Sequence, residues 1–166
     1  WFAKKIGFND SSGGIAASGG TLSNLNALIA ARHNSGLGSD PNSVLLVSED
    51  AHSSFIKCTR IMGLDEANLI RIKTDNNGSI DIQNLRKTID KCFIDNKKIF
   101  AIVATLGTTV RGAIDPIKDI SEICKERNIW LHIDGSIGGI FSITSIPIEG
   151  LNNINQANSI TINPQK

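Results

Sequence analysis

No apolar run in these 166 residues approaches the roughly 20 residues that a membrane-spanning helix needs. The chain has no surplus of positive charge either, because 17 lysines and arginines stand against 16 aspartates and glutamates. Its first five residues, Trp1 to Lys5, resemble neither a signal peptide nor a start at an initiator methionine. We therefore expect neither a membrane nor a nucleic acid as a partner.

Cysteine is scarce, and no two cysteines are close in the sequence. Cys58, Cys92 and Cys124 are odd in number, widely spaced and without a CxxC pair, and each falls in a helix-like segment. Small buried side chains are therefore expected rather than metal ligands or redox pairs. No HxxxH motif is present, so no metal site is expected. Free thiols favour a reducing, cytoplasmic setting.

The usual nucleotide-binding fingerprints are also missing. Ser18-Gly19-Gly20-Thr21 precedes a helical pattern, but it is not GxGxxG and lacks the Gly-Lys-Ser/Thr ending of a P-loop. Backbone N–H groups at such a helix start can bind a phosphate, with hydroxyl groups as further donors. A tight glycine turn without any ligand explains the same residues.

What the chain does contain is an alternation of short apolar runs and amphipathic helices, without repeats or linkers. Hydrophobic residues make up 40% of it, which suits one domain with a core. Asp81 is expected to cap one helix, and Asp115 another that has Pro116 at its first position. Strands are expected at 44–47, 69–72, 99–104, 129–133 and 160–162, and helices at 22–32, 55–62, 82–93 and 116–128. This order predicts an α/β fold with a mainly parallel central sheet and helices on both faces.

Polar residues follow several of these strands, at the edge where ligands bind in such sheets. They are His52, Thr108 and Thr109, Asp134, and Lys166. Asp134 can pair with a pyridinium nitrogen, and a lysine amine can form a Schiff base with an aldehyde, so pyridoxal phosphate is one explanation. Ordinary charges at two strand ends are the other. His33, at a helix end, and His132, inside a strand, are expected to be structural.

Five stretches of the chain, in order, resemble the pyridoxal-phosphate-dependent group II amino-acid decarboxylases. The resemblance implies the type I fold of these transferases and their large cofactor-binding domain. Residues 1–166 would be part of that domain, without its N-terminal segment, catalytic loop and small C-terminal domain, and we expect this piece alone to be inactive. The stretches are 18–24, 51–54, 104–109 with 112–116, 130–134 and 163–166.

The resemblance also implies roles around pyridoxal 5′-phosphate. Lys166 would carry the internal aldimine, and His52 and Asp134 would act with it in catalysis, His52 stacked on the ring and Asp134 paired with the ring nitrogen. The implied reaction converts a small-molecule L-amino acid to its amine and CO2, in a homodimer. The remaining cofactor-binding residues would be Gly20 and Thr21 at the phosphate, Thr109 beside the ring, Ser136 under it, and Gln165.

The chain departs from the family pattern at three positions. Asp134 is followed by Gly135 and Ser136 where the family has two alanines, and Gln165 stands where the family has a phosphate-binding histidine. The uncharged glutamine is expected to lower the affinity for phosphate. A related carbon–carbon (aldehyde) lyase, a non-catalytic remnant of the fold and a nucleotide-binding α/β domain are the alternatives.

Overall fold

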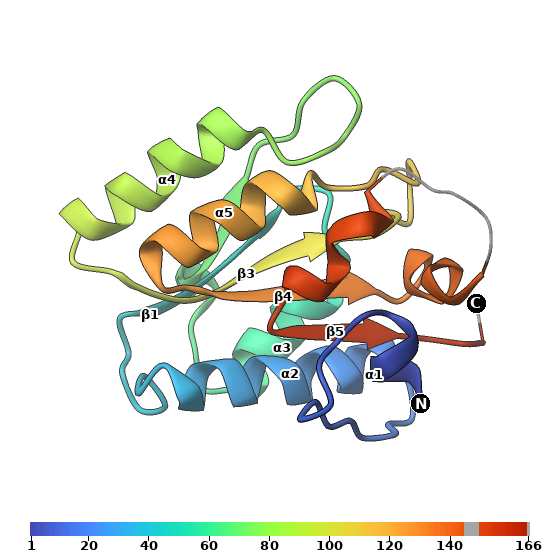
Figure 1. The fold of residues 1–166 in the computed structure, drawn as a ribbon. Helices are drawn as coiled ribbons and strands as arrows, with labels where there is room; N and C mark the ends of the chain where they lie inside the picture. Colours follow the sequence, from blue (N-terminus) through green and yellow to red (C-terminus); the bar gives the residue numbers. More distant parts are fainter. Residues whose placement is uncertain (145–149, 166) are drawn as a thin grey trace.

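A five-stranded sheet forms the centre of the computed structural model, which describes residues 1–144 and 150–165. The strand order is β2-β1-β3-β4-β5, and every neighbouring pair is parallel (Figure 1). The α/β class and the parallel sheet are thus confirmed. The strands are β1 (Ser43–Ser48), β2 (Leu69–Ile72), β3 (Lys98–Thr105), β4 (Trp130–Gly135) and β5 (Ser159–Ile162).

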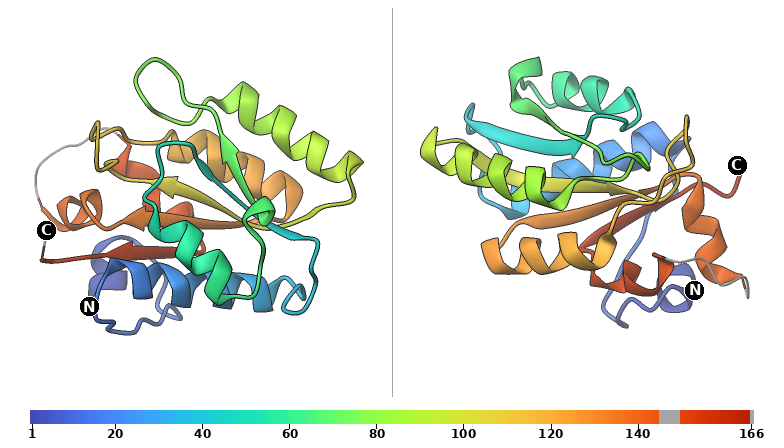
Figure 2. Two further views of the ribbon diagram at one scale, coloured as in Figure 1. Left: turned by 180° about the vertical axis from the view of Figure 1, so that it is seen from behind. Right: turned by 90° about the horizontal axis from the view of Figure 1, so that it is seen from above.

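Helices cover both faces of this sheet, as predicted. The pair α2 and α3 packs on one face and the pair α4 and α5 on the other (Figures 1 and 2). In the described part of the chain no helix is long and apolar enough to cross a membrane. The helices are α1 (Phe2–Lys5), α2 (Gly20–Asn34), α3 (Ser54–Ile61), α4 (Ile82–Ile94) and α5 (Ile117–Arg127), with 3₁₀ helices η1 (Glu66–Asn68), η2 (Gly138–Ile143) and η3 (Leu151–Gln156).

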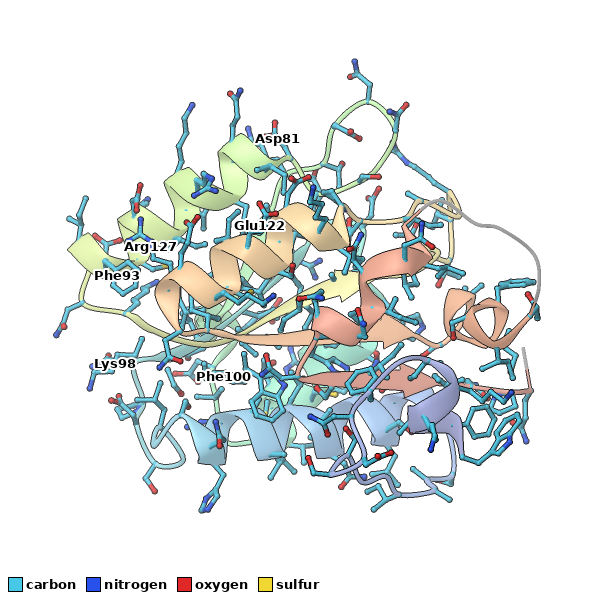
Figure 3. The ribbon with its side chains drawn as sticks, viewed as in Figure 1. Asp81, Phe93, Lys98, Phe100, Glu122 and Arg127 are labelled. Carbon is cyan, nitrogen blue, oxygen red and sulfur yellow. The ribbon has the colours of Figure 1, made fainter. Side chains whose placement is uncertain are left out.

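The central strands are buried on both sides, which explains why β1 and β3 read as continuous apolar runs. Side chains on one face, such as Phe100 on β3 (Figure 3), pack with α2 and α3. Those on the other face, such as Ile102, pack with α4 and α5. The three cysteines lie on α3, α4 and α5 and are free and buried, as predicted.

Two aspartates predicted as helix caps have different roles. Asp81 caps α4, because its carboxylate accepts a hydrogen bond from the backbone N–H of Asn84 at 3.0 Å. Asp115 is not a cap, and that prediction was wrong. Its carboxylate accepts from the backbone N–H groups of Ile80 (2.8 Å) and Thr105 (2.7 Å), and α5 begins after Pro116 without a side-chain cap. These two buried N–H groups need an acceptor more than the helix end does.

Helix α2 does not bury all of its large apolar side chains. Leu22 and Ile29 are 42% and 48% exposed. Asn24 and Arg32 are buried beside the leucines that face the sheet. The Arg32 guanidinium donates to the carbonyl oxygens of residues 37, 40 and 62 and to the hydroxyl of Ser43, and these bonds compensate for burying its charge.

Helices α4 and α5 also contact each other near their carboxyl ends. Arg127 on α5 lies beside Phe93 on α4 (Figure 3), with its guanidinium 5.5 Å from the ring centre. The same guanidinium lies 2.9 Å from the Asp90 carboxylate. Exposed contacts of this kind stabilise by only about 0.5–1 kcal/mol each. Both helices end where the strands begin, so this contact lies away from the carboxyl edge of the sheet.

Candidate active site

A pocket opens at the carboxyl edge of the sheet, where the strand order reverses between β1 and β3. Ligands bind at this kind of position in open parallel sheets. The pocket has about 540 Å³ of empty space, including the part open to solvent, which is a usual size for a small-molecule site. Six of the predicted site residues line it together: Gly20, Thr21, His52, Thr109, Asp134 and Ser136.

The amino end of helix α2 forms one wall of this pocket. The helix begins at Gly20, and neither its N-cap Gly19 nor any acidic side chain in the first turn satisfies the leading N–H groups. These groups and the helix dipole therefore present positive charge to the pocket. None of the described residues that line the pocket is lysine or arginine, so the backbone is the main feature of the described wall that can hold a phosphate.

Asp134 places a carboxylate on the floor, near the end of β4. The residue is only 5% exposed and pairs in register with Thr105 on β3. Its Oδ1 accepts from the backbone N–H of Ser136 at 3.1 Å and from the Ser136 hydroxyl at 2.6 Å. Within the described ranges no hydrogen bond reaches Oδ2. One oxygen is thus tied back into the protein and the other is left for a ligand.

His52 follows β1 on the loop that leads into α3 and is exposed at the pocket. Its Nδ1 lies 3.2 Å from the backbone N–H of Ser54, which donates to it, and 2.8 Å from the Ser54 hydroxyl. Because Nδ1 accepts, the neutral ring carries its hydrogen on Nε2. Two bonds at one nitrogen fix the ring and leave its face free to stack on a planar ligand.

A hydrogen-bonded turn after β3 brings Thr109 to the pocket. The backbone N–H groups of Gly107 and Thr108 both donate to the carbonyl of Ala113, whose own N–H donates to the Thr108 hydroxyl at 3.1 Å. Thr108 is buried, whereas Thr109 is exposed. Gly107 has a φ of 87°, which favours glycine at this position. These hydrogen bonds fix the turn and so hold Thr109 in place at the pocket.

A buried chain of hydrogen bonds runs beneath the pocket. Trp130 Nε1 donates to the Ser159 hydroxyl (2.8 Å), which contacts Nδ1 of His132 (2.9 Å). Nε2 of His132 lies 3.0 Å from Oδ1 of Asn24. Burial lowers the pKa of His132 to about 4, although the charge of Asp134 acts the other way. His132 is thus neutral at pH 7, and it packs inside the protein as predicted.

Asn24 is a pocket residue that the sequence interpretation missed. It is 1% exposed, its amide oxygen is held by His132, and it lines the pocket. No hydrogen bond joins its amide nitrogen to another residue of the described ranges. Its position four residues after Gly20, on the same side of a helix, was the available signal. Ser54, Thr105 and Asn163 also line the pocket without having been predicted.

Cys58 lies close to this site but does not belong to its chemistry. Its thiol approaches the carbonyl oxygen of Thr21 at 3.8 Å. Burial, together with the nearby charge of Asp134, raises the pKa of Cys58 to about 11. The thiol therefore stays protonated and unreactive at neutral pH.

Two predicted site residues remain, Gln165 and Lys166. Gln165 is exposed and does not line the pocket, and its backbone N–H donates to Asn163 Oδ1 at 3.2 Å. Lys166 lies outside the described residues. The cofactor roles of both residues stay predictions.

The residues of the pocket fit pyridoxal 5′-phosphate. A carboxylate oxygen without a partner among the described residues suits a pyridinium nitrogen, and the uncapped N–H groups at the start of α2 suit a phosphate. The Thr105 hydroxyl is buried without a partner among the described residues, and Thr105 also lines the pocket. The described ranges hold no cluster of three His, Cys, Asp or Glu side chains placed for a metal ion.

Comparisons with known proteins agree with this description. The family model "Pyridoxal-dependent decarboxylase conserved domain" matches residues 1–166. An aromatic-L-amino-acid decarboxylase of Bacillus atrophaeus is 32% identical over all of this chain and 35% of its own length. The acidic amino acid decarboxylase GADL1 of Xenopus tropicalis is 34% identical over 92% of this chain and 31% of its own length. The crystal structure of mouse CSAD matches 99% of this chain and 36% of its own, with a TM-score of 0.93 and 30% identity.

These relatives are considerably longer than the present sequence. The chain spans about a third of the length of the curated proteins that it matches. The family model covers every residue of the pocket described above.

Proposed function

The chain belongs to the pyridoxal-dependent decarboxylase family, and from this we propose that its protein removes the α-carboxyl group of an L-amino acid as CO2 and releases the amine. One observation carries the proposal. A buried carboxylate, Asp134, has one oxygen without a partner among the described residues, in a pocket that is also lined by the uncapped start of α2. The bound cofactor would supply a protonated ring that accepts the electron pair left by the departing CO2.

The residues of this chain have distinct parts in the proposal. The N–H groups at Gly20 and Thr21 hold the phosphate, and Asp134 keeps the ring nitrogen protonated. The fixed imidazole of His52 stacks on the ring face and helps to exclude water. Ser136 lies under the ring, and its contact with Asp134 supports that placement.

Three further residues complete the proposed site. Thr109 stands beside the ring at the rim of the pocket. Lys166 holds the cofactor covalently through its amine. Gln165 acts near the phosphate as an uncharged hydrogen-bond donor in place of a histidine.

The class of amino acid is not settled by the similar proteins. One relative is named for aromatic and another for acidic amino acids, at nearly the same identity. Side-chain recognition is therefore proposed to use parts of the protein outside the pocket described here.

We also propose a homodimer in the cytoplasm. Exposed apolar side chains on α2, Leu22 and Ile29, support an interface with a second copy. Free buried cysteines support a reducing compartment. Light scattering of the purified protein would measure the mass, and a monomer at micromolar concentration would contradict the dimer.

A product assay tests the proposed reaction. The protein as the cell makes it would be supplied with pyridoxal 5′-phosphate and a panel of aromatic and acidic L-amino acids. We expect CO2 and the matching amine in equal amounts from at least one substrate, and neither product from the Lys166→Ala variant. Release of an aldehyde by carbon–carbon cleavage would support the related lyase, and binding of the cofactor without any turnover would support a non-catalytic remnant.

A further inference from the structure

The hydrogen bond between Ser136 and Asp134 is the shortest polar contact described in the pocket wall. The hydroxyl oxygen lies 2.6 Å from Oδ1, and the backbone N–H of Ser136 donates to the same oxygen at 3.1 Å. A short O–H···O⁻ bond is charge-assisted and roughly twice as strong as a neutral one. Asp134 is 5% exposed, so solvent does little to weaken this bond.

The Ser136 hydroxyl has room in the pocket wall because residue 20 is a glycine. A Cβ atom built on Gly20 would lie 2.7 Å from Ser136 Oγ, which is closer than real Cβ contacts come. The hydroxyl thus sits between the start of α2 and the carboxylate of Asp134. Any larger residue at position 20 would push it out of line with Oδ1.

The two donors on Oδ1 have a consequence for Oδ2. A carboxylate held by one donor can rotate about its χ2 bond, because that torsion is broad. Two donors at the same oxygen restrict this rotation and keep Oδ2 directed to the pocket. An alanine at position 136 would leave only the backbone donor.

We propose that Ser136 is a positioning residue for Asp134, whose hydroxyl holds the carboxylate so that Oδ2 meets the ring nitrogen of the cofactor. The inference rests on the proposed function and assigns to this serine a task that an alanine cannot perform. Ser136 acts through Asp134, so its effect depends on the ring nitrogen. A ligand without that nitrogen gains nothing from the hydroxyl.

The test is the affinity for two ligands that cannot bond covalently to lysine. They are pyridoxamine 5′-phosphate and its 1-deaza analogue, in which a carbon replaces the ring nitrogen. Equilibrium dialysis against the protein as the cell makes it gives the dissociation constants. We expect Ser136→Ala to weaken the binding of pyridoxamine phosphate about 5- to 10-fold, because the Asp134 carboxylate must then be ordered when the ligand binds. The binding of the analogue should stay unchanged.

Two further variants control the experiment. Ser136→Thr keeps a hydroxyl and should bind pyridoxamine phosphate more tightly than Ser136→Ala. Ser121→Ala removes another buried serine hydroxyl, which donates to the Lys118 carbonyl on α5 and does not line the pocket. It should change neither dissociation constant.

Some outcomes would overturn the inference. One is a Ser136→Ala variant that binds pyridoxamine phosphate as tightly as the unmodified protein. Another is an equal weakening of both ligands, which would mean that the hydroxyl merely supports the shape of the loop. An unmodified protein that binds neither ligand would overturn the proposed function, and this inference with it.

Discussion

Asp115 and Asp134 are both buried carboxylates at the carboxyl edge of the sheet, yet their hydrogen bonds differ in kind. Asp115 uses both oxygens, one for the N–H of Ile80 and one for the N–H of Thr105. Asp134 uses Oδ1 twice and has no described partner at Oδ2. A carboxylate satisfied on both oxygens joins loops, whereas one with a free oxygen in a pocket is available to a ligand. Burial alone would not separate the two.

The largest expected effect is the loss of activity when the carboxylate of Asp134 is removed. Asp134→Asn should lower kcat/KM for decarboxylation by about 10³-fold, as expected for loss of an electrostatic partner of the reacting group. An amide oxygen can still accept from Ser136, so the free energy of unfolding of the cofactor-free protein should change by less than about 1 kcal/mol. Steady-state kinetics and urea unfolding measure the two quantities. Activity within tenfold of the unmodified protein would remove Asp134 from the site.

Removal of the other carboxylate should mainly affect stability. Asp115→Ala should lower the free energy of unfolding by about 3 kcal/mol, because two buried N–H groups lose their acceptor. Asp119→Ala, at an exposed position in the first turn of α5, is the matched control and should cost less than about 1 kcal/mol. If urea unfolding gave the same loss of stability for both variants, Asp115 would not be holding the two N–H groups as described.

Asp115 and His132 are expected to change the stability of the protein with pH in opposite directions. Burial raises the pKa of Asp115 from 3.8 to about 6, with the charges of Asp75 and Asp50 adding to it and two backbone hydrogen bonds opposing it. The folded state then binds more protons than the unfolded state between pH 4 and 6. The contribution of Asp115 to stability is therefore present at low pH and declines as pH rises through this window. Burial lowers the pKa of His132 from 6.5 to about 4, so its contribution declines as pH falls through nearly the same window.

These opposite trends partly offset each other in the unmodified protein. In Asp115→Asn the contribution of Asp115 is lost and only that of His132 remains. The stability of this variant should therefore fall more steeply between pH 6.5 and 4 than that of the unmodified protein. The added loss is at most about 3 kcal/mol for a shift of about two pKa units. Urea midpoints of the cofactor-free protein across this range measure it. Parallel pH profiles for the two proteins would show that Asp115 does not titrate in this window.

A smaller effect is expected at Gly135, between Asp134 and Ser136. A Cβ atom there would lie 2.7 Å from the carbonyl oxygen of Thr161 and 3.0 Å from the Cα of Gly139. Gly135→Ala, although alanine is the residue expected from the family pattern, should destabilise the fold by about 1–3 kcal/mol through overpacking. Gly14→Ala, with open space around it, is the control and should change little. Thermal unfolding that ranks the two variants equally would contradict the close contact.

The five strands and helices α2 to α5 could be predicted within one or two residues, because local patterns determine them, whereas the short helix α1 and the 3₁₀ helices were not predicted. The run 44–47 is apolar throughout since β1 is covered on both faces, and the period of 82–93 is that of a helix with one buried side. The polar strand ends at His52 and Asp134 could be predicted to meet because parallel strands share a carboxyl edge.

Contacts between distant residues could not be predicted in the same way. Asp115 next to Pro116 has the local signature of a cap, whereas its partner Ile80 lies 35 residues away. Asn24 and Arg32 break the apolar face of α2, because hydrogen bonds formed only in the folded protein permit their burial. The free oxygen of Asp134 depends on the direction of one hydroxyl, which no sequence pattern records.

The most direct test of the account is to identify which residue holds the cofactor. The protein as the cell makes it would be loaded with pyridoxal 5′-phosphate, reduced with borohydride, digested and mapped by mass spectrometry. The account predicts a phosphopyridoxyl group on Lys166, at the end of the segment that follows β5. A label on another lysine, or no label at all, would contradict it.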